Sequence, residues 1–122
     1  MNFDNNIPIY TQILDYIKVS IISGKLKPGD KLPSIREYAN ILKVNPNTMQ
    51  KALVELEWLG LVYTERTSGK YVTRSQKTID RLRKEYADRV VNDFFVKMKK
   101  IGLNNANAID YLQRRIEKWA RY

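Results

Sequence analysis

The sequence contains no cysteine and no histidine among its 122 residues. The absence of cysteine excludes disulfides and thiol chemistry, and the absence of histidine removes the commonest general base and a frequent zinc ligand. No apolar run approaches the roughly 20 residues that a membrane-spanning helix needs. The polar start MNFDNNIPIY is unlike a secretory signal. We therefore expect a cytoplasmic protein that holds no metal and no cofactor.

The chain has an excess of positive charge. Lysine and arginine together number 22 against 13 aspartate and glutamate residues, which gives a formal net charge of +9. Such an excess favours polyanionic partners, so nucleic acid and an anionic membrane surface both remain open from charge alone. Hydrophobic residues make up 43% of the chain, which is enough to form a core.

Three amphipathic helices are predicted in the first half of the chain. Apolar residues recur three and four positions apart after Pro8, again in SIREYANILK and again in NPNTMQKALVEL. Ser34 and Glu37 form a capping-box pattern at the start of the second helix. Asn45 and Pro46 suit the N-cap and first position of the third. The predicted core faces are Ile9, Ile13, Leu14, Ile17, Ile21 and Ile22; Ile35, Tyr38, Ala39 and Leu42; and Met49, Leu53, Leu56 and Leu59.

A hairpin is predicted after the third helix. LVYTER and KYVTR are β-branched and aromatic segments, and the small residues Thr67, Ser68 and Gly69 separate them. The order helix, helix, turn, helix, hairpin is that of a winged helix-turn-helix. We therefore predict a mainly helical fold with a small β-hairpin, in which residues 1–75 form a DNA-binding domain.

The remaining residues, 76–122, predict two helices. A helical period runs from about Gln76 to Gly102, and Asn104 or Asn105 can cap a last helix. The apolar stripe is wider than one face of a short helical hairpin can bury, which favours contact with a second copy of the chain. The alternative is that this tail folds back on its own DNA-binding domain. The predicted dimerisation residues are Tyr86, Val90, Val91, Phe94, Phe95, Met98, Leu112, Ile116 and Trp119.

The start of the third helix has two interpretations. An asparagine cap followed by proline begins a helix well without any ligand. A DNA major groove, however, admits one α-helix whose first residues meet base edges, where amides can bond adenine and lysine can reach guanine or phosphate. Asn47, Thr48, Gln50 and Lys51 offer this chemistry, whereas Asn45 and Pro46 serve the helix start first.

Two other elements offer matching chemistry. Arg36 lies in the first turn of the second helix, and the hairpin tip is basic and rich in small residues, as suits backbone or minor-groove contact. Lys77, Arg81 and Arg83 follow the hairpin closely enough to add phosphate contacts. The predicted DNA-binding set is Ser34, Arg36, Asn45, Asn47, Thr48, Gln50, Lys51, Arg66, Thr67, Ser68, Gly69 and Lys70.

These motifs resemble a known family. SGKLKPGDKLPSIREYA, KVNPNTMQKALVELEWLGLVYTER and GKYV are similar, in order and spacing, to the DNA-binding domain of GntR-family bacterial transcription regulators. The resemblance implies that Arg36, the start of the third helix and the hairpin tip meet operator DNA. Two departures matter: many relatives have arginine where Pro46 and Gln50 stand, and Thr67 replaces the first glycine of the usual Gly-x-Gly wing.

The short tail resembles that of the small YtrA-like subfamily, which implies dimerisation through the tail and genes that often accompany ABC transporters. The sequence thus predicts a dimeric transcription repressor that binds a pseudo-palindromic operator and responds to a small-molecule or peptide effector. The alternative is an amphipathic-peptide or membrane-surface binder that uses the basic, aromatic tail, although no stable membrane association is expected. An enzyme is not expected, because acid pairs such as Glu55 and Glu57 lie on different faces of a helix and no phosphate-binding loop is present.

Overall fold

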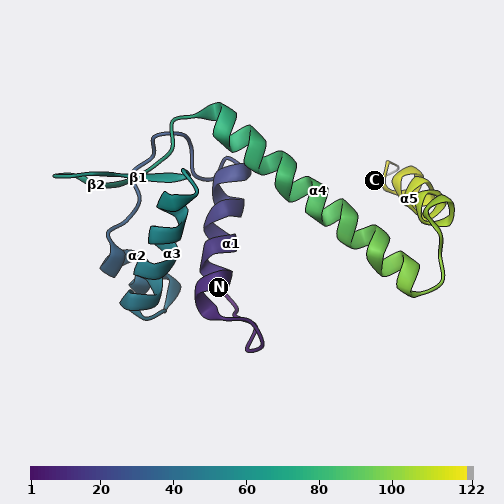
Figure 1. Cartoon of the computed structure of the whole chain (residues 1–122), viewed down its shortest axis with the longest axis horizontal. Helices are drawn as coiled ribbons and strands as arrows, with labels where there is room; N and C mark the ends of the chain where they lie inside the picture. The colour runs from purple at the N-terminus through teal and green to yellow at the C-terminus, as the bar shows by residue number, and fades with distance from the viewer. Residues whose placement is uncertain (121–122) are drawn as a thin grey trace. The chain divides into compact units, whose positions relative to one another are not determined.

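The computed structural model describes residues 1–120. The elements follow in the order α1 (Ile9–Ile22), α2 (Ile35–Leu42), α3 (Pro46–Trp58), β1 (Val62–Glu65), β2 (Gly69–Val72), α4 (Gln76–Lys100) and α5 (Asn105–Trp119) (Figure 1). The predicted fold class, mainly helical with a small hairpin, is confirmed. The chain divides into two compact units, Met1–Arg83 and a second unit that begins at Lys84.

The helix starts follow from short polar side chains. Asn45 is the N-cap of α3, and its side-chain oxygen accepts a 2.8 Å hydrogen bond from the Asn47 amide, with Pro46 in the first turn. Ser34 Oγ accepts from the Glu37 amide at 3.2 Å. Within residues 1–120 the Ser34 amide does not donate in return to the Glu37 carboxylate, so half of the predicted capping box forms. A complete capping box occurs instead at α5, between Asn104 and Asn107.

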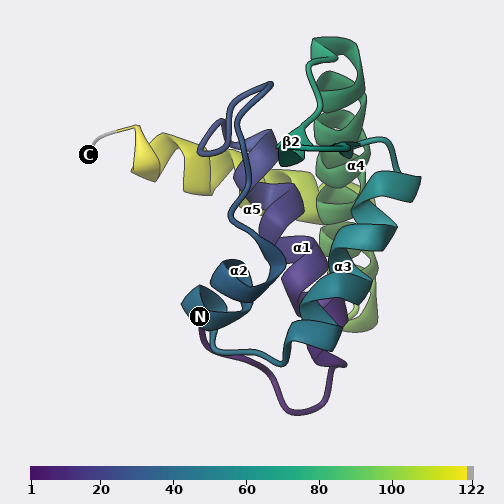
Figure 2. The ribbon, with the colours of Figure 1, turned by 90° about the vertical axis from the view of Figure 1, so that its left-hand side faces the viewer.

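The core of the first unit lies between α1 and α3, which run side by side (Figure 1 and Figure 2). The largest fully buried side chains of these helices are Ile13, Ile17 and Ile21 on α1 and Met49, Leu53 and Leu56 on α3. Each row follows the helical period, as predicted. Two residues placed in these stripes from the sequence lie outside the core: Ile9, the first residue of α1, is 46% exposed, and Leu59, which follows α3, is 44% exposed.

The first turns of α4 belong to this core. Ile79 and Leu82 are buried and belong to the same hydrophobic cluster as the core residues of α1 and α3. The sequence places a domain boundary between residues 75 and 76, at the start of α4, whereas the compact units divide after Arg83. The difference arises because these two apolar residues complete the core of the first unit.

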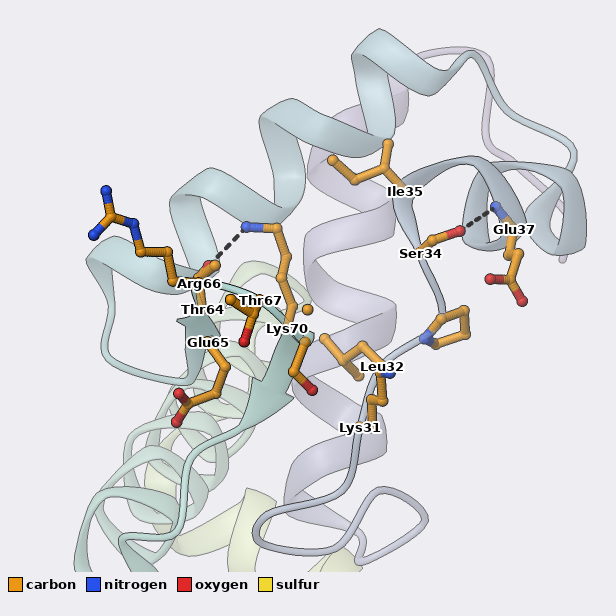
Figure 3. Close-up of a pocket in the computed structure, with 13 residues that line it drawn as sticks. Lys31, Leu32, Ser34, Ile35, Glu37, Thr64, Glu65, Arg66, Thr67 and Lys70 are labelled. Carbon is orange, nitrogen blue, oxygen red and sulfur yellow. Dashed lines mark hydrogen bonds between the residues drawn. The ribbon is translucent and has the colours of Figure 1, made fainter.

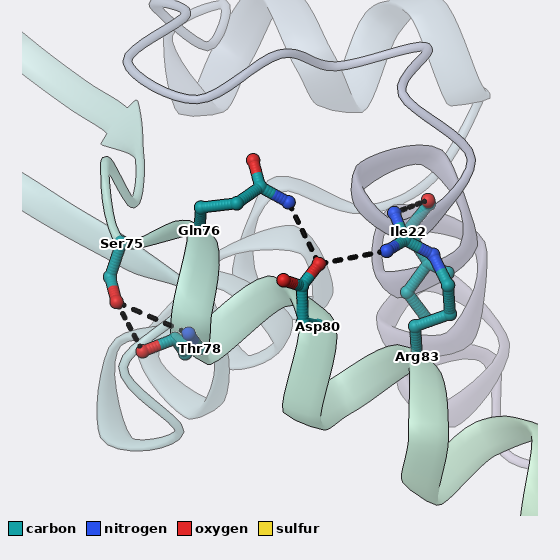
Figure 4. A network of polar contacts seen from close by, with 6 residues as sticks. All are labelled: Ile22, Ser75, Gln76, Thr78, Asp80 and Arg83. Atoms are coloured by element: carbon teal, nitrogen blue, oxygen red, sulfur yellow. Dashed lines mark hydrogen bonds and ion pairs between the residues drawn. The ribbon is translucent and has the colours of Figure 1, made fainter.

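Polar contacts fix the start of α4 (Figure 4). Ser75 Oγ accepts hydrogen bonds from the amide and the hydroxyl of Thr78, at 3.1 and 2.9 Å. Arg83 donates to the Ile22 carbonyl at 2.7 Å and pairs with Asp80 at 2.9 Å. The guanidinium therefore satisfies a carbonyl at the C-terminal end of α1, where helix carbonyls lack partners.

The hairpin has a third, short neighbour. β1 and β2 pair antiparallel from Val62 opposite Val72 to Glu65 opposite Gly69, with residues 66–68 in the turn. The segment Gly29–Leu32 lies along the other edge of β2, where the Leu32 amide donates to the Lys70 carbonyl and the Val72 amide to the Asp30 carbonyl, both at 2.8 Å. This segment links the hairpin to the start of α2.

The second unit buries little apolar surface. Among its residues up to 120, Ala108 alone is buried. Val90, Val91, Ile116 and Trp119 are 53 to 68% exposed, and Phe94 and Phe95 are half-buried with their rings edge to face at 5.3 Å. Within residues 1–120, no helix combines the length and the apolar character needed to cross a membrane.

Lys43 provides a test of the turn between α2 and α3. It caps α2 in the left-handed conformation, at φ 58°, which is unfavourable for a residue with a side chain. We expect Lys43→Gly to raise the free energy of unfolding by roughly 0.5–1 kcal/mol, and Lys43→Val to lower it, because β-branched residues tolerate this conformation worst. Urea unfolding measures both. If valine were as stable as glycine, the left-handed cap would be contradicted.

Candidate nucleic-acid interface

The first two turns of α3 expose two amide side chains. Asn47 and Gln50 are exposed, and neither side chain forms a hydrogen bond within residues 1–120. Thr48 is half-buried, and Met49 beside it is fully buried. The side-chain oxygen of Asn45 is occupied as the helix cap, in agreement with its predicted structural role. The free amides of Asn47 and Gln50 have donors and acceptors in the arrangement that bonds the major-groove edge of adenine.

The start of α2 places Ser34 and Arg36. Both residues are exposed, and Ser34 Oγ is the acceptor that caps the helix. Arg36 is the second residue of α2 and forms no ion pair within the described part of the chain. Its guanidinium is therefore free to bond a phosphate or a guanine.

The hairpin tip is held by aromatic and hydroxyl contacts. Arg66, Thr67 and Ser68 are exposed in the turn, and the Ser68 hydroxyl bonds the Tyr71 hydroxyl. The Tyr71 ring stacks on Tyr63, with ring centroids 5.6 Å apart. These contacts support a turn that lacks the first glycine of the family's usual wing.

A cleft of about 830 Å³ joins the hairpin tip to the start of α2 (Figure 3). Its walls are residues 31–35 with Glu37 on one side and residues 64–70 on the other. It therefore brings together Ser34 with the predicted hairpin residues Arg66, Thr67, Ser68, Gly69 and Lys70. Arg36 and the α3 residues Asn47, Thr48, Gln50 and Lys51 do not line it. The predicted set therefore divides between this cleft, Arg36 on α2 and the start of α3.

Two predicted lysines are engaged within the protein. The Lys51 ammonium lies 3.9 Å from the centroid of the Tyr10 ring, a cation–π contact with α1. Lys70 forms an ion pair with Glu57 near the end of α3 and donates to Thr64 Oγ1 at 3.0 Å (Figure 3). Their contact with DNA stays a prediction.

Glu57 joins the hairpin to α3, a role that the sequence pattern did not indicate. Its carboxylate also accepts a 2.6 Å hydrogen bond from Thr64, which lies opposite Lys70 in the hairpin register. The hydrogen bonds from Lys70 and Thr64 hold the pKa of the Glu57 carboxyl below its ordinary value. Thirteen residues separate Glu57 from Lys70, so no local periodicity relates them.

The cations that follow the hairpin differ in their surroundings. Lys77 and Arg81 are exposed. Arg83, in contrast, is bonded to Asp80 and to the Ile22 carbonyl. Its predicted contact with phosphate would require it to leave the end of α1.

Comparisons with known proteins bear on this site. Residues 9–72 match the family described as bacterial regulatory proteins, gntR family. The chain is 39% identical over 108 residues to an uncharacterised HTH-type transcriptional regulator, YhcF, of Bacillus subtilis, covering 88% of this chain and 89% of YhcF. It is 49% identical over 71 residues to the transcriptional repressor YtrA of the same organism, covering 58% of this chain and 55% of YtrA.

Solved structures give the same result. A GntR family transcriptional regulator from Listeria monocytogenes has a TM-score of 0.86 at 40% identity and covers 92% of this chain and 98% of its own. The DNA-binding domain of AraR, solved in complex with operator ORX1, has a TM-score of 0.52 at 31% identity and covers 55% of this chain and 81% of its own. These relatives are regulators, not enzymes, and the predicted winged helix-turn-helix is confirmed. The chain belongs to the gntR family of bacterial regulatory proteins, which are DNA-binding transcription regulators.

Proposed function

We propose that this chain is a dimeric repressor that binds a pseudo-palindromic operator through α3, the start of α2 and the hairpin. The observation that carries the proposal is the exposure of Asn47 and Gln50, whose side chains form no hydrogen bond within residues 1–120, on the first two turns of α3. The relative YtrA is named a repressor, which supports repression. Occupying a promoter is sufficient to block transcription.

The base chemistry of this site favours adenine. Asparagine and glutamine bond adenine bidentately, whereas arginine and lysine prefer guanine. Pro46 and Gln50 stand where many family members have arginine, so Arg36 is the guanidinium available near the recognition helix. We therefore expect an operator half-site in which A·T pairs face α3.

The second unit supports dimerisation. Most of its apolar residues remain exposed in a single copy. Ala108 is its one buried side chain up to residue 120, which is too little to stabilise a helical unit alone. A two-fold partner would cover the predicted dimerisation residues Tyr86, Val90, Val91, Phe94, Phe95, Met98, Leu112, Ile116 and Trp119. Two first units related by such an axis would read half-sites about 34 Å apart, or a multiple of that spacing.

The family resemblance extends the proposal to a promoter of an ABC-type transporter operon and to release by a small-molecule or peptide effector. Selection of bound duplexes from a randomised library identifies the operator. Release of that duplex by candidate substrates of the transporter that the operon encodes then tests the effector. If none of these substrates releases the duplex, the proposed effector control is contradicted.

Membrane-surface or amphipathic-peptide binding is the second candidate function. It is favoured by α5, where Ile116 and Trp119 are exposed and the Arg115 guanidinium lies 5.4 Å from the Trp119 ring. Arg36→Ala combined with Asn47→Ala separates the two functions. We expect this variant to lose operator binding and to bind anionic vesicles no differently from the wild type.

Asn47→Ala tests base reading. We expect a loss of about 1–3 kcal/mol on the selected duplex and much less on a random duplex, because only a base contact depends on sequence. The matched control is Asn40→Ala, which removes the same side chain at an exposed position on α2 instead of α3. Fluorescence anisotropy measures both affinities, and equal losses on the two duplexes would refute the role of Asn47.

Phe94→Asp tests the proposed dimer. A buried, unpaired carboxylate is costly, so we expect a monomer whose operator affinity falls sharply. Asn92→Asp adds the same charge at a nearby exposed position and should leave the dimer intact. Sedimentation gives the oligomeric state, and circular dichroism checks that helix content is retained. A Phe94→Asp variant that remains dimeric would rule out a dimer contact through Phe94.

A further inference from the structure

Two lysines border the cleft between the hairpin and the start of α2. Lys70 lies on β2, and Lys31 lies on the segment that flanks β2. The hairpin position of Lys70 predicts that it contacts DNA. The surroundings of the two ammonium groups instead favour Lys31 for this contact.

Lys70 is occupied within the protein. Its side chain is only 20% exposed, its ammonium is paired with Glu57 and bonded to Thr64, and Thr64 is bonded to Glu57 in turn. The three groups form a closed triangle between the end of α3 and both strands of the hairpin. Moving Lys70 to a DNA phosphate would leave a partly buried carboxylate without its cation, which is unfavourable.

Lys31 is exposed, and its ammonium forms no ion pair within residues 1–120. Glu37 and Glu65 line the same cleft but do not pair with it. Its backbone is held, because Lys31 pairs with Tyr71 as an antiparallel bridge and its neighbours Asp30 and Leu32 hydrogen-bond β2. A free ammonium on a fixed backbone is suited to meet a phosphate.

Gly69 lies next to the Lys31 side chain. A Cβ at Gly69 would lie 3.4 Å from Lys31 Cε, so the lysine stem passes over the one hairpin residue without a side chain. Gly69 also has φ +125°, which a residue with a side chain rarely adopts. The glycine therefore serves the hairpin conformation, and the Lys31 stem lies beside it at an ordinary contact distance.

We propose that Lys31 supplies the lysine contact to DNA phosphate beside the hairpin, whereas Lys70, paired with Glu57, positions the hairpin against α3. This inference rests on the proposed DNA-binding function. It adds Lys31 as a DNA-contacting residue and assigns Glu57, Thr64 and Lys70 to positioning.

The salt dependence of binding tests this assignment, because each lysine–phosphate contact adds to the slope of log affinity against log salt concentration. On the selected duplex, Lys31→Met should reduce that slope by about 0.9 per protomer. Lys70→Met should lower affinity roughly 3- to 10-fold through the displaced hairpin and leave the slope unchanged. Lys25→Met is the control, because it removes the same charge at a lysine that does not line the cleft and whose ammonium contacts Tyr16 on α1. It should leave the slope unchanged.

A double-mutant cycle tests the positioning pair. Glu57→Gln should weaken binding, and adding it to Lys70→Met should cause little further loss, because both changes break the same contact. If Lys70 were instead a DNA contact restrained by Glu57, Glu57→Gln would release it and give tighter binding with a steeper salt slope. Thermal unfolding shows whether each variant is folded, and only folded variants enter the double-mutant cycle.

An unchanged slope for Lys31→Met, a reduced slope for Lys70→Met or tighter binding by Glu57→Gln would each overturn the inference. None of these results would affect the proposed function, since the wild type would still bind DNA. Failure of the wild type to bind any duplex in a salt-dependent manner would instead refute the proposed function.

Discussion

The burial of one face of α3 against α1 determines where the rest of α3 points. Met49, Leu53 and Leu56 are fully buried, so the helical period turns Asn47 and Gln50 outward. The Asn45 cap fixes where this period begins. Because the spacing of these residues along the helix fixes their relative directions, burial of the core face sets the exposed face. The exposure of Asn47 and Gln50 is thus a consequence of core packing, on a helix whose start the Asn45 cap stabilises.

Local rules predicted much of this structure. The caps at Ser34 and Asn45 and the helical stripes depend on residues within about four positions of one another, which is the range that capping and periodicity describe. The hairpin joins two neighbouring segments through a short turn, a pattern that sequence also shows. The pairings that sequence could not indicate are distant. Lys51 contacts Tyr10, Arg83 contacts Ile22, and Lys70 contacts Glu57. Such pairs depend on how whole helices and strands are placed in three dimensions. All three cations, which the sequence predicts as DNA contacts, are engaged within the protein.

The two units differ in which side chains they expose. The first unit has a closed core to which α1, α3, the hairpin and the start of α4 all contribute. The groups proposed to bind DNA are polar and lie outside that core. Within residues 84–120 the second unit has almost no core of its own, and most of its apolar side chains are exposed. DNA recognition is thus assigned to polar side chains on the surface of a unit with its own core, and dimerisation to apolar side chains that one copy leaves uncovered.

Hydroxyl-radical footprinting on the selected duplex tests the central claim most directly, because it reports both sequence preference and two-fold symmetry. The account predicts two symmetry-related protected segments whose centres are about 34 Å apart along the duplex, or a multiple of that spacing. A single protected segment, or uniform protection without sequence preference, would contradict it.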